Sequence, residues 1–175
     1  MRSLRAGFWL LALSLAACSA EPDAKTGAVP GPSSVELAPD FTLPDLTGKP
    51  VRLAEFRGKT VIIDFWATWC PPCEFQVPEL NALRKAHAEA ADVAVLGIAV
   101  DVEGVEVVAP WSEEKGIEYI TLIGDEDLAR EFGAMGFPTL VVVGPNGVIE
   151  SRHVGVLEVK ELEEIVAAIQ AAPST

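Results

Sequence analysis

The sequence has few of the residues that several common classes of functional site require. Its 175 residues include three cysteines and two histidines, and a structural zinc site normally needs four such ligands close together. Lysine and arginine number 13 against 26 aspartates and glutamates, which gives a formal net charge of -13. A surface this acidic repels phosphate backbones and anionic lipid headgroups. Metal binding and nucleic-acid binding are therefore poor hypotheses for this chain.

The apolar run near the N-terminus is also short. "FWLLALSLAA" covers residues 8–17, about half of the roughly 20 residues that a membrane-spanning helix needs. It follows Arg2 and Arg5, and a positive start before a short apolar run is typical of an export signal that is cleaved off. We therefore expect residues 1–17 to be absent from the mature protein.

The end of that run, "LAAC", resembles the lipobox of bacterial lipoproteins. The resemblance implies that Cys18 becomes the lipidated first residue of the mature chain, and several acyl chains hold a protein firmly at a membrane. Ordinary secretion, with cleavage at nearby small residues, is the alternative. Residues 18–37 are rich in proline, glycine, serine and alanine and have no apolar periodicity. This composition predicts a flexible tether.

The remaining residues, 38–172, are enough for one domain with a substantial core. "VIIDFWA", residues 61–67, is a continuous apolar and β-branched run that predicts a strand covered on both faces. Pro71 and Pro72 are expected to start a helix that runs toward Ala90. The apolar face of this helix would consist of Val77, Leu80, Leu83 and Ala86.

The rest of the domain alternates between strands and helices. The patterns predict strands at residues 93–101 and 119–125, helices at 105–116, 127–134 and 159–172, and a β-hairpin at 139–156. This order predicts an α/β fold with a mixed central sheet and helices on both faces.

Two of the three cysteines, Cys70 and Cys73, stand where the first strand gives way to the first helix. The helix dipole and unpaired backbone N–H groups at such a position stabilise an anion, so the Cys70 thiolate should be favoured. Cys73, one turn further on, is close enough to form a disulfide with it and to resolve a mixed disulfide. The alternatives are a zinc site, for which ligands are too few, and a structural disulfide, which gains little over so short a loop.

Three motifs that follow one another in a familiar order identify a family. They are "DFWATWCPPC" at residues 64–73, Pro78, and "GFPT" at residues 136–139. Pro78 should kink the helix. Together the three motifs resemble those of the thioredoxin superfamily. The resemblance covers residues 38–172 and implies the thioredoxin fold. Residues 38–59 resemble the extra N-terminal β-hairpin of the membrane-tethered TlpA/ResA-like, AhpC/TSA-type branch, which peroxiredoxins share. "ATWCPPC" lacks the Thr-x-x-Cys context of peroxiredoxins, so peroxidase chemistry is disfavoured.

The resemblance also implies roles for single residues. Pro138 matches the family's cis-proline beside the cysteines, so the Phe137–Pro138 bond should be cis. The backbone of Phe137 should then pair with an extended substrate chain. Trp66 would pack in the core. The expected substrate-binding residues are Trp69, Pro71, Pro72, Phe137 and Pro138.

Asp64 matches the buried aspartate of thioredoxins, whose raised pKa lets it take the proton of the resolving cysteine near neutral pH. ResA-like proteins often lack that aspartate, and a glutamate three residues after the second cysteine is thought to serve instead. This chain has Gln76 at that place. We therefore expect Asp64 to be the sole acid–base group for Cys73, while Gln76 only forms hydrogen bonds. His87 and His153 are expected at the surface.

These residues predict a thiol–disulfide oxidoreductase with Cys70 as nucleophile and no metal or organic cofactor. The resemblance to the tethered branch implies a periplasm-facing lipoprotein of the cell envelope that reduces disulfides of exported proteins, for example in cytochrome c maturation. Electrons would come from a membrane donor because the periplasm is oxidising, and we expect a monomer. A disulfide-forming oxidant stays open, as does a non-catalytic binding module that uses the groove beside Phe137.

Overall fold

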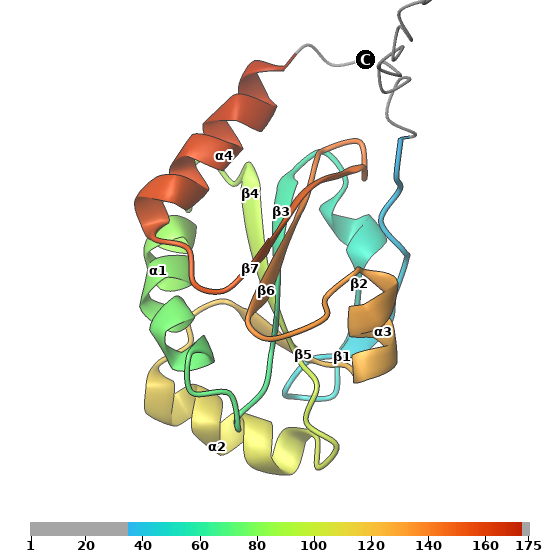
Figure 1. The fold of residues 1–175 in the computed structure, drawn as a ribbon, viewed down its shortest axis with the longest axis vertical. Helices are drawn as coiled ribbons and strands as arrows, with labels where there is room; N and C mark the ends of the chain where they lie inside the picture. The colour runs from blue at the N-terminus through green and yellow to red at the C-terminus, as the bar shows by residue number, and fades with distance from the viewer. Residues whose placement is uncertain (1–34, 173–175) are drawn as a thin grey trace, which may run out of the picture. The chain divides into compact units, whose positions relative to one another are not determined.

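The computed structural model describes residues 35–172. Within this range the chain forms a central five-stranded sheet in the order β5-β4-β3-β6-β7 (Figure 1). Strand β3 pairs in parallel with β4, β4 pairs in parallel with β5, and β6 is antiparallel to both β3 and β7. The prediction of a mixed sheet is therefore confirmed. The strands are β3 (Thr60–Trp66), β4 (Val93–Ala99), β5 (Ile120–Ile123), β6 (Thr139–Val143) and β7 (Ile149–Val154).

A second, two-stranded sheet precedes the central one and confirms the expected N-terminal hairpin. Strands β1 (Thr42–Pro44) and β2 (Pro50–Arg52) pair antiparallel, and the 3-10 helix η1 (Leu53–Phe56) follows them. A bridge between Asp45 and Leu122 joins this hairpin to the β5 edge of the central sheet. The predicted export signal, the lipidation of Cys18 and most of the tether lie outside the described residues.

Helices cover both faces of the central sheet. Figure 1 shows α1 and α4 side by side on one side of the strands and α3 on the other. Side chains of β3 alternate between two buried clusters: Ile63 and Phe65 pack with Phe132 beside α3, whereas Ile62 packs with α1 and α4. By this alternation Asp64 faces α1 and α4. The helices are α1 (Cys73–Ala86), α2 (Val105–Lys115), α3 (Glu126–Glu131) and α4 (Val159–Ala171).

Helix α1 differs from the prediction at both ends. It begins at Cys73 with Pro72 as its N-cap, so Pro71 and Pro72 form the turn before the helix rather than its first turn. Cys70 therefore precedes the helix, and its carbonyl accepts the N–H of Cys73 at 3.0 Å. The helix ends at Ala86 rather than Ala90, and Ala86 is exposed instead of lying on the apolar face. Pro78 lies inside the helix as expected, and the kink there stays a prediction.

His87, the residue that follows α1 as its C-cap, is partly buried, so the expectation that it lies at the surface is wrong. Its Nδ1 lies 3.0 Å from a carboxylate oxygen of Asp92 and its Nε2 lies 2.9 Å from one of Glu163 in α4. Burial lowers the pKa of this imidazole, but the hydrogen bonds to Glu163 and Asp92 outweigh that effect and raise it above the ordinary value. The sequence shows His87 among charged and small residues, and the two acceptors meet it only in the folded chain. His153 is exposed as expected.

We expect His87→Gln to destabilise the fold by about 1 kcal/mol at pH 5.5, because it removes a charged donor between two carboxylates. The stability that the raised pKa of His87 contributes is fully present below the unfolded pKa of about 6.5. It is lost as the pH rises through the folded pKa, so the two proteins should converge by pH 8.5. Urea denaturation at both pH values measures this difference. The exposed His153→Gln serves as the control and should match the unaltered protein at each pH.

Candidate active site

The dithiol lies at the end of the central strand β3. The strand ends at Trp66, three residues of loop follow, and Cys70 begins the turn that leads through the two prolines into α1. Cys70 and Cys73 are joined in a disulfide, with their Cα atoms 5.4 Å apart. The fold thus brings the two cysteines together as the spacing predicted.

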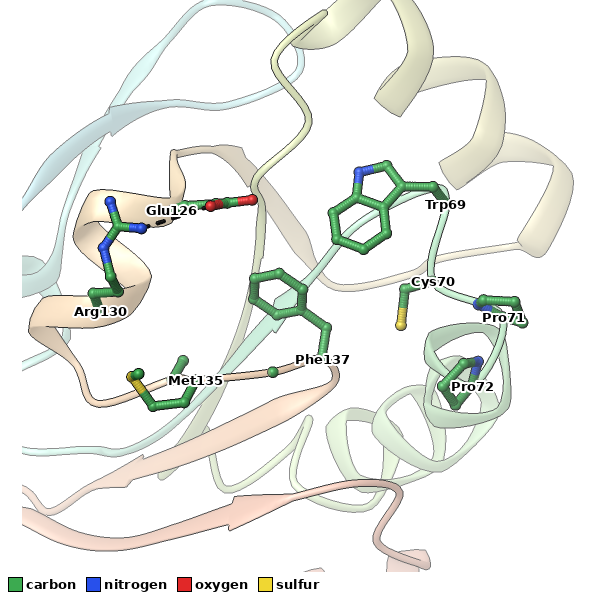
Figure 2. Close-up of a pocket in the computed structure, with 10 residues that line it drawn as sticks. Trp69, Cys70, Pro71, Pro72, Glu126, Arg130, Met135 and Phe137 are labelled. Atoms are coloured by element: carbon green, nitrogen blue, oxygen red, sulfur yellow. Dashed lines mark ion pairs between the residues drawn. The ribbon is translucent and has the colours of Figure 1, made fainter.

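Only one of the two cysteines of the disulfide borders the groove at this end of the sheet. Cys70 is among the residues that line it, and Figure 2 shows its sulfur pointing into the space between Trp69, Phe137 and Pro72. Both residues are largely buried, with 4% of Cys70 and 1% of Cys73 exposed, but Cys73 lies outside the lining. A partner molecule in the groove would therefore meet Cys70 first. The lining residues are Trp69, Cys70, Pro71, Pro72, Glu126, Arg130, Ala134, Met135, Gly136 and Phe137.

The walls of the groove near Cys70 are apolar. Trp69 is 60% exposed and its ring meets that of Phe137 edge to face, with centroids 5.8 Å apart. Met135, which is 82% exposed, continues this surface. Toward α3 the groove carries an ion pair in which Arg130 lies 3.6 Å from Glu126 (Figure 2). The groove therefore offers apolar contact beside the reactive sulfur and charge further away.

The segment opposite the dithiol has the predicted backbone. The Phe137–Pro138 peptide bond is cis, Pro138 is buried, and its carbonyl accepts the N–H of Gly155 at 2.9 Å. The hydroxyl of Thr139 donates to the carbonyl of Gly136 at 2.6 Å. These contacts fix the loop from both sides, so Phe137 is presented to the groove.

Asp64 is buried, as expected. It is 1% exposed, and its Oδ1 finds no hydrogen-bond partner among residues 35–172. Burial raises the pKa of this carboxyl to about 8. Gln76 is also buried, and its amide is paired with the backbone of Leu157: its Nε2 donates to the carbonyl at 3.1 Å and its Oε1 accepts the N–H at 2.8 Å. Gln76 thus holds the segment that leads into α4. Of the two buried side chains, only that of Asp64 is a carboxyl, and its raised pKa lies near neutral pH.

Asp101 is a supporting residue that the sequence reasoning missed. Its buried carboxylate accepts the backbone N–H of Thr68 at 3.1 Å and the hydroxyl of Thr68 at 2.5 Å. This fixes the loop that leads from β3 to Cys70. A signal was present, because Asp101 is the last residue of the predicted strand at 93–101. It stands two residues after the end of β4, which neighbours β3, so its carboxylate reaches the same end of the sheet.

The reasoning also missed half of the groove lining. Trp69, Cys70, Pro71, Pro72 and Phe137 were predicted, whereas Met135, Gly136, Ala134 and the charged pair of α3 were not. Met135 and Gly136 stand directly before Phe137 in the sequence and could have been inferred from it. No cluster of three or more histidine, cysteine, aspartate or glutamate side chains suited to a metal occurs among the described residues.

The sequence profile of the AhpC/TSA family matches residues 35–152. The chain belongs to the AhpC/TSA family. Within this family it resembles the thioredoxin-like protein YneN of Bacillus subtilis, with 31% identity over 129 residues that cover 74% of this chain and 76% of YneN. It is 30% identical over 134 residues to the thiol-disulfide oxidoreductase ResA of Geobacillus thermodenitrificans, which covers 76% of each chain.

Solved structures place this AhpC/TSA-family chain in the thioredoxin fold. A thiol:disulfide interchange protein of the thioredoxin family from Chlorobium tepidum superposes with a TM-score of 0.70 and 29% identity, covering 79% of this chain and 98% of the other. The protein is thus a TlpA/ResA-like member of the thioredoxin superfamily and a thiol–disulfide oxidoreductase. In the part of the chain that the structure describes, no helix has the length and apolar character to cross a membrane.

Proposed function

We propose that this oxidoreductase reduces disulfides of exported proteins in the cell envelope. The observation that carries the proposal is the asymmetry of the dithiol: Cys70 borders an apolar groove, and Cys73 is buried behind it. Such an arrangement suits one sulfur for attack on a partner and the other for internal resolution. Apocytochrome c is a candidate partner, on the strength of the resemblance to the tethered branch.

The proposed reaction moves two electrons from the enzyme to its partner. The Cys70 thiolate attacks one sulfur of the partner's disulfide, an intermolecular S–S bond forms, and the other partner sulfur leaves as a thiolate. The Cys73 thiolate then attacks the Cys70 sulfur and displaces the partner's second thiolate. The enzyme ends with the Cys70–Cys73 disulfide, and the partner ends with two thiols once its thiolates are protonated. A membrane electron donor would return the enzyme to the dithiol.

Asp64 is proposed as the group that takes the proton of Cys73 before the second attack. Its support is burial together with a pKa of about 8, which lies close to that of an ordinary thiol. A base with a matched pKa accepts a proton most effectively near the working pH. Because Gln76 is neutral and its amide is held by the backbone of Leu157, it is not a rival for this role.

We expect Asp64→Asn to slow the release of a mixed disulfide by about a hundredfold above pH 8, the loss typical of a missing general base. The first attack by Cys70 should be unchanged, since no proton of Cys73 moves in that step. Stopped-flow mixing of the reduced protein with a fluorescent mixed-disulfide peptide separates the two phases. Release at the unaltered rate across this pH range would remove Asp64 from the mechanism.

The direction of exchange depends on the reduction potential. We expect a value nearer about -270 mV, that of a reductant, than about -120 mV, that of a strong oxidant. Equilibration of the protein with dithiothreitol or glutathione buffers, followed by alkylation of free thiols, gives this number. A reduction potential near about -120 mV would contradict the proposed reductive function and indicate a disulfide-forming oxidant.

The site is proposed to work without metal or organic cofactor, since the two cysteines hold and pass the electrons themselves. We propose further that Cys18 carries the lipid that holds the protein at the membrane, facing the periplasm, with residues 18–37 as tether. The support for this is the sequence "LAAC" after a short apolar run. Metabolic labelling with a fatty acid, lost on Cys18→Ser, tests the anchor.

A further inference from the structure

The groove beside the dithiol has two walls, and different elements hold them. Figure 2 shows Trp69 and the two prolines on one side and Met135 with Phe137 on the other. Asp101 fixes the loop that carries Trp69. The opposite side consists of residues 134–137, which all line the groove and which we call the Met135 wall. The position of this wall sets the space that a partner polypeptide can enter.

The Met135 wall directly follows the end of α3. Phe132 is the C-cap of this helix, and Gly133, with a φ of +76°, turns the chain away from it. The N–H of Ala134 donates to the carbonyl of Ala129 at 2.8 Å, which closes the turn in a way that is common at helix ends. The first residue of the wall is therefore placed by this turn.

Arg152 of β7 holds the turn from outside. Its Nε donates to the carbonyl of Phe132 at 2.6 Å, and a cationic donor suits the last carbonyls of a helix. A Cβ atom on Gly133 would lie 2.9 Å from the same Nε, so the glycine leaves room for the guanidinium. Three residues further along the chain, the N–H of Gly155 donates to the carbonyl of Pro138 at 2.9 Å. The segment from Arg152 to Gly155 thus holds the Met135 wall at both ends.

The other end of the Arg152 guanidinium is held by Glu36. Nη1 donates to one carboxylate oxygen of Glu36 at 3.0 Å and Nη2 donates to the other at 2.5 Å, which is a bidentate pair. The hydrogen bond to Arg152 lowers the pKa of Glu36, so the carboxylate is charged at neutral pH. Glu36 is itself fixed, because its carbonyl accepts the N–H of Ile149 at 2.8 Å. With these three donors bound, the planar guanidinium is held in one orientation.

We propose that Arg152 is a positioning residue for partner binding: it fixes the end of α3, and so the Met135 wall against which a partner polypeptide lies, while Glu36 orients its guanidinium. This inference rests on the proposed function, in which polypeptides bind in the groove. Arg152 is not among the residues that line the groove, so it acts through the backbone of the wall. Its loss should weaken the binding of a polypeptide and leave the chemistry of Cys70 intact.

The first test separates binding from chemistry. The reduced protein is mixed with rising concentrations of the fluorescent mixed-disulfide peptide used for Asp64→Asn, and the first phase gives a half-saturating concentration and a limiting rate. In Arg152→Gln the half-saturating concentration should rise by about tenfold, the loss expected for a hydrogen bond from a charged donor, while the limiting rate changes by less than about twofold. With 2-hydroxyethyl disulfide, which has no peptide to bind, Arg152→Gln should react as fast as the unaltered protein.

Two further variants complete this test. Glu36→Gln keeps the bond from Arg152 to Phe132 but weakens the bidentate pair, so the half-saturating concentration should rise by about threefold. Arg52→Gln is the matched control, because it makes the same change at an exposed arginine that pairs with Glu55 at 3.3 Å and is not among the lining residues. It should leave both reactions unchanged. If Arg152→Gln does not fold, the result for Glu36→Gln decides the question.

The second test observes the wall directly by amide hydrogen exchange. The N–H of Ala134 closes the turn after α3, so it should exchange about tenfold faster in Arg152→Gln, in which the turn opens more often. The N–H of Thr68, which Asp101 holds on the opposite wall, should exchange at its unaltered rate.

A raised half-saturating concentration in Arg152→Gln, an unchanged reaction with the small disulfide and faster exchange at Ala134 but not at Thr68 support the proposal. An unchanged half-saturating concentration, an equal loss with the small disulfide, or the same exchange response at both amides overturns it. Failure of the proposed function would be seen in the unaltered protein, as the reduction potential of an oxidant, whereas the inference about Arg152 is decided by differences between variants.

Discussion

Replacing Cys70 with serine is expected to reduce disulfide exchange to the uncatalysed rate. A hydroxyl at this position is far less acidic than a thiol and forms no disulfide, so neither the first attack nor the covalent intermediate is possible. Cys73 does not substitute for it, because only Cys70 borders the groove and Cys73 is 1% exposed. Reduction of a model protein disulfide, followed with dithiothreitol as electron source, measures this loss.

The matched control for this variant is Cys18→Ser, the same chemical change at a cysteine that the proposed reaction does not use. It should leave the exchange rate in solution unchanged. The competing hypothesis of a non-catalytic binding module predicts that Cys70→Ser behaves like this control. Retained function in Cys70→Ser would therefore favour the binding module over the enzyme.

Asp64→Asn is expected to stabilise the fold by on the order of 4 kcal/mol at pH 8.5. Burial raises the pKa of Asp64 from 3.8 to about 8. Between these two pH values the folded protein holds a proton on Asp64 that the unfolded chain releases. The stability associated with the raised pKa is fully present below about pH 3.8 and is lost as the pH rises through about 8. An asparagine carries no charge at either pH, so the variant does not lose this stability.

Chemical denaturation of the oxidised protein between pH 4 and pH 8.5 tests this expectation. The unaltered protein should lose stability across that window, whereas Asp64→Asn should change much less, with the two close together at pH 4. Asp101→Asn provides the comparison, because Asp101 is also buried but accepts hydrogen bonds from the backbone N–H and the hydroxyl of Thr68. Its substitution should destabilise the protein. A loss of stability in Asp64→Asn at pH 8.5 would mean that the carboxylate is compensated in the native state.

The parts of the site that could be predicted from the sequence depend on neighbours in the chain. The strand before Cys70, the pairing of Cys70 with Cys73 and the burial of Asp64 follow from residues within one short segment. The cis bond at Pro138 came from the resemblance to a family rather than from any local pattern. Each of these expectations agrees with the structure.

The parts that could not be predicted depend on contacts across the fold. Thr68 and Asp101 are 33 residues apart, and His87 and Glu163 are 76 residues apart. No periodicity or spacing in the sequence shows that His87 and Glu163 will meet. The contact of Thr68 with Asp101 can be inferred only once β3 and β4 are known to be neighbours. The predicted start of α1 was wrong for a different reason. A proline fits both the first turn of a helix and the turn before it, and Pro71 and Pro72 lie in the turn before α1.

The central claim is that Cys70 attacks partner disulfides and Cys73 resolves the intermediate, and the most direct measurement is a covalent trap. Reduced Cys73→Ala should accumulate complexes with exported proteins that are joined through Cys70 and dissociate on treatment with dithiothreitol. The double variant Cys70→Ala, Cys73→Ala should capture nothing. If Cys73→Ala, expressed in the envelope at the level of the unaltered protein, forms no more covalent complexes than the double variant, the claim is contradicted.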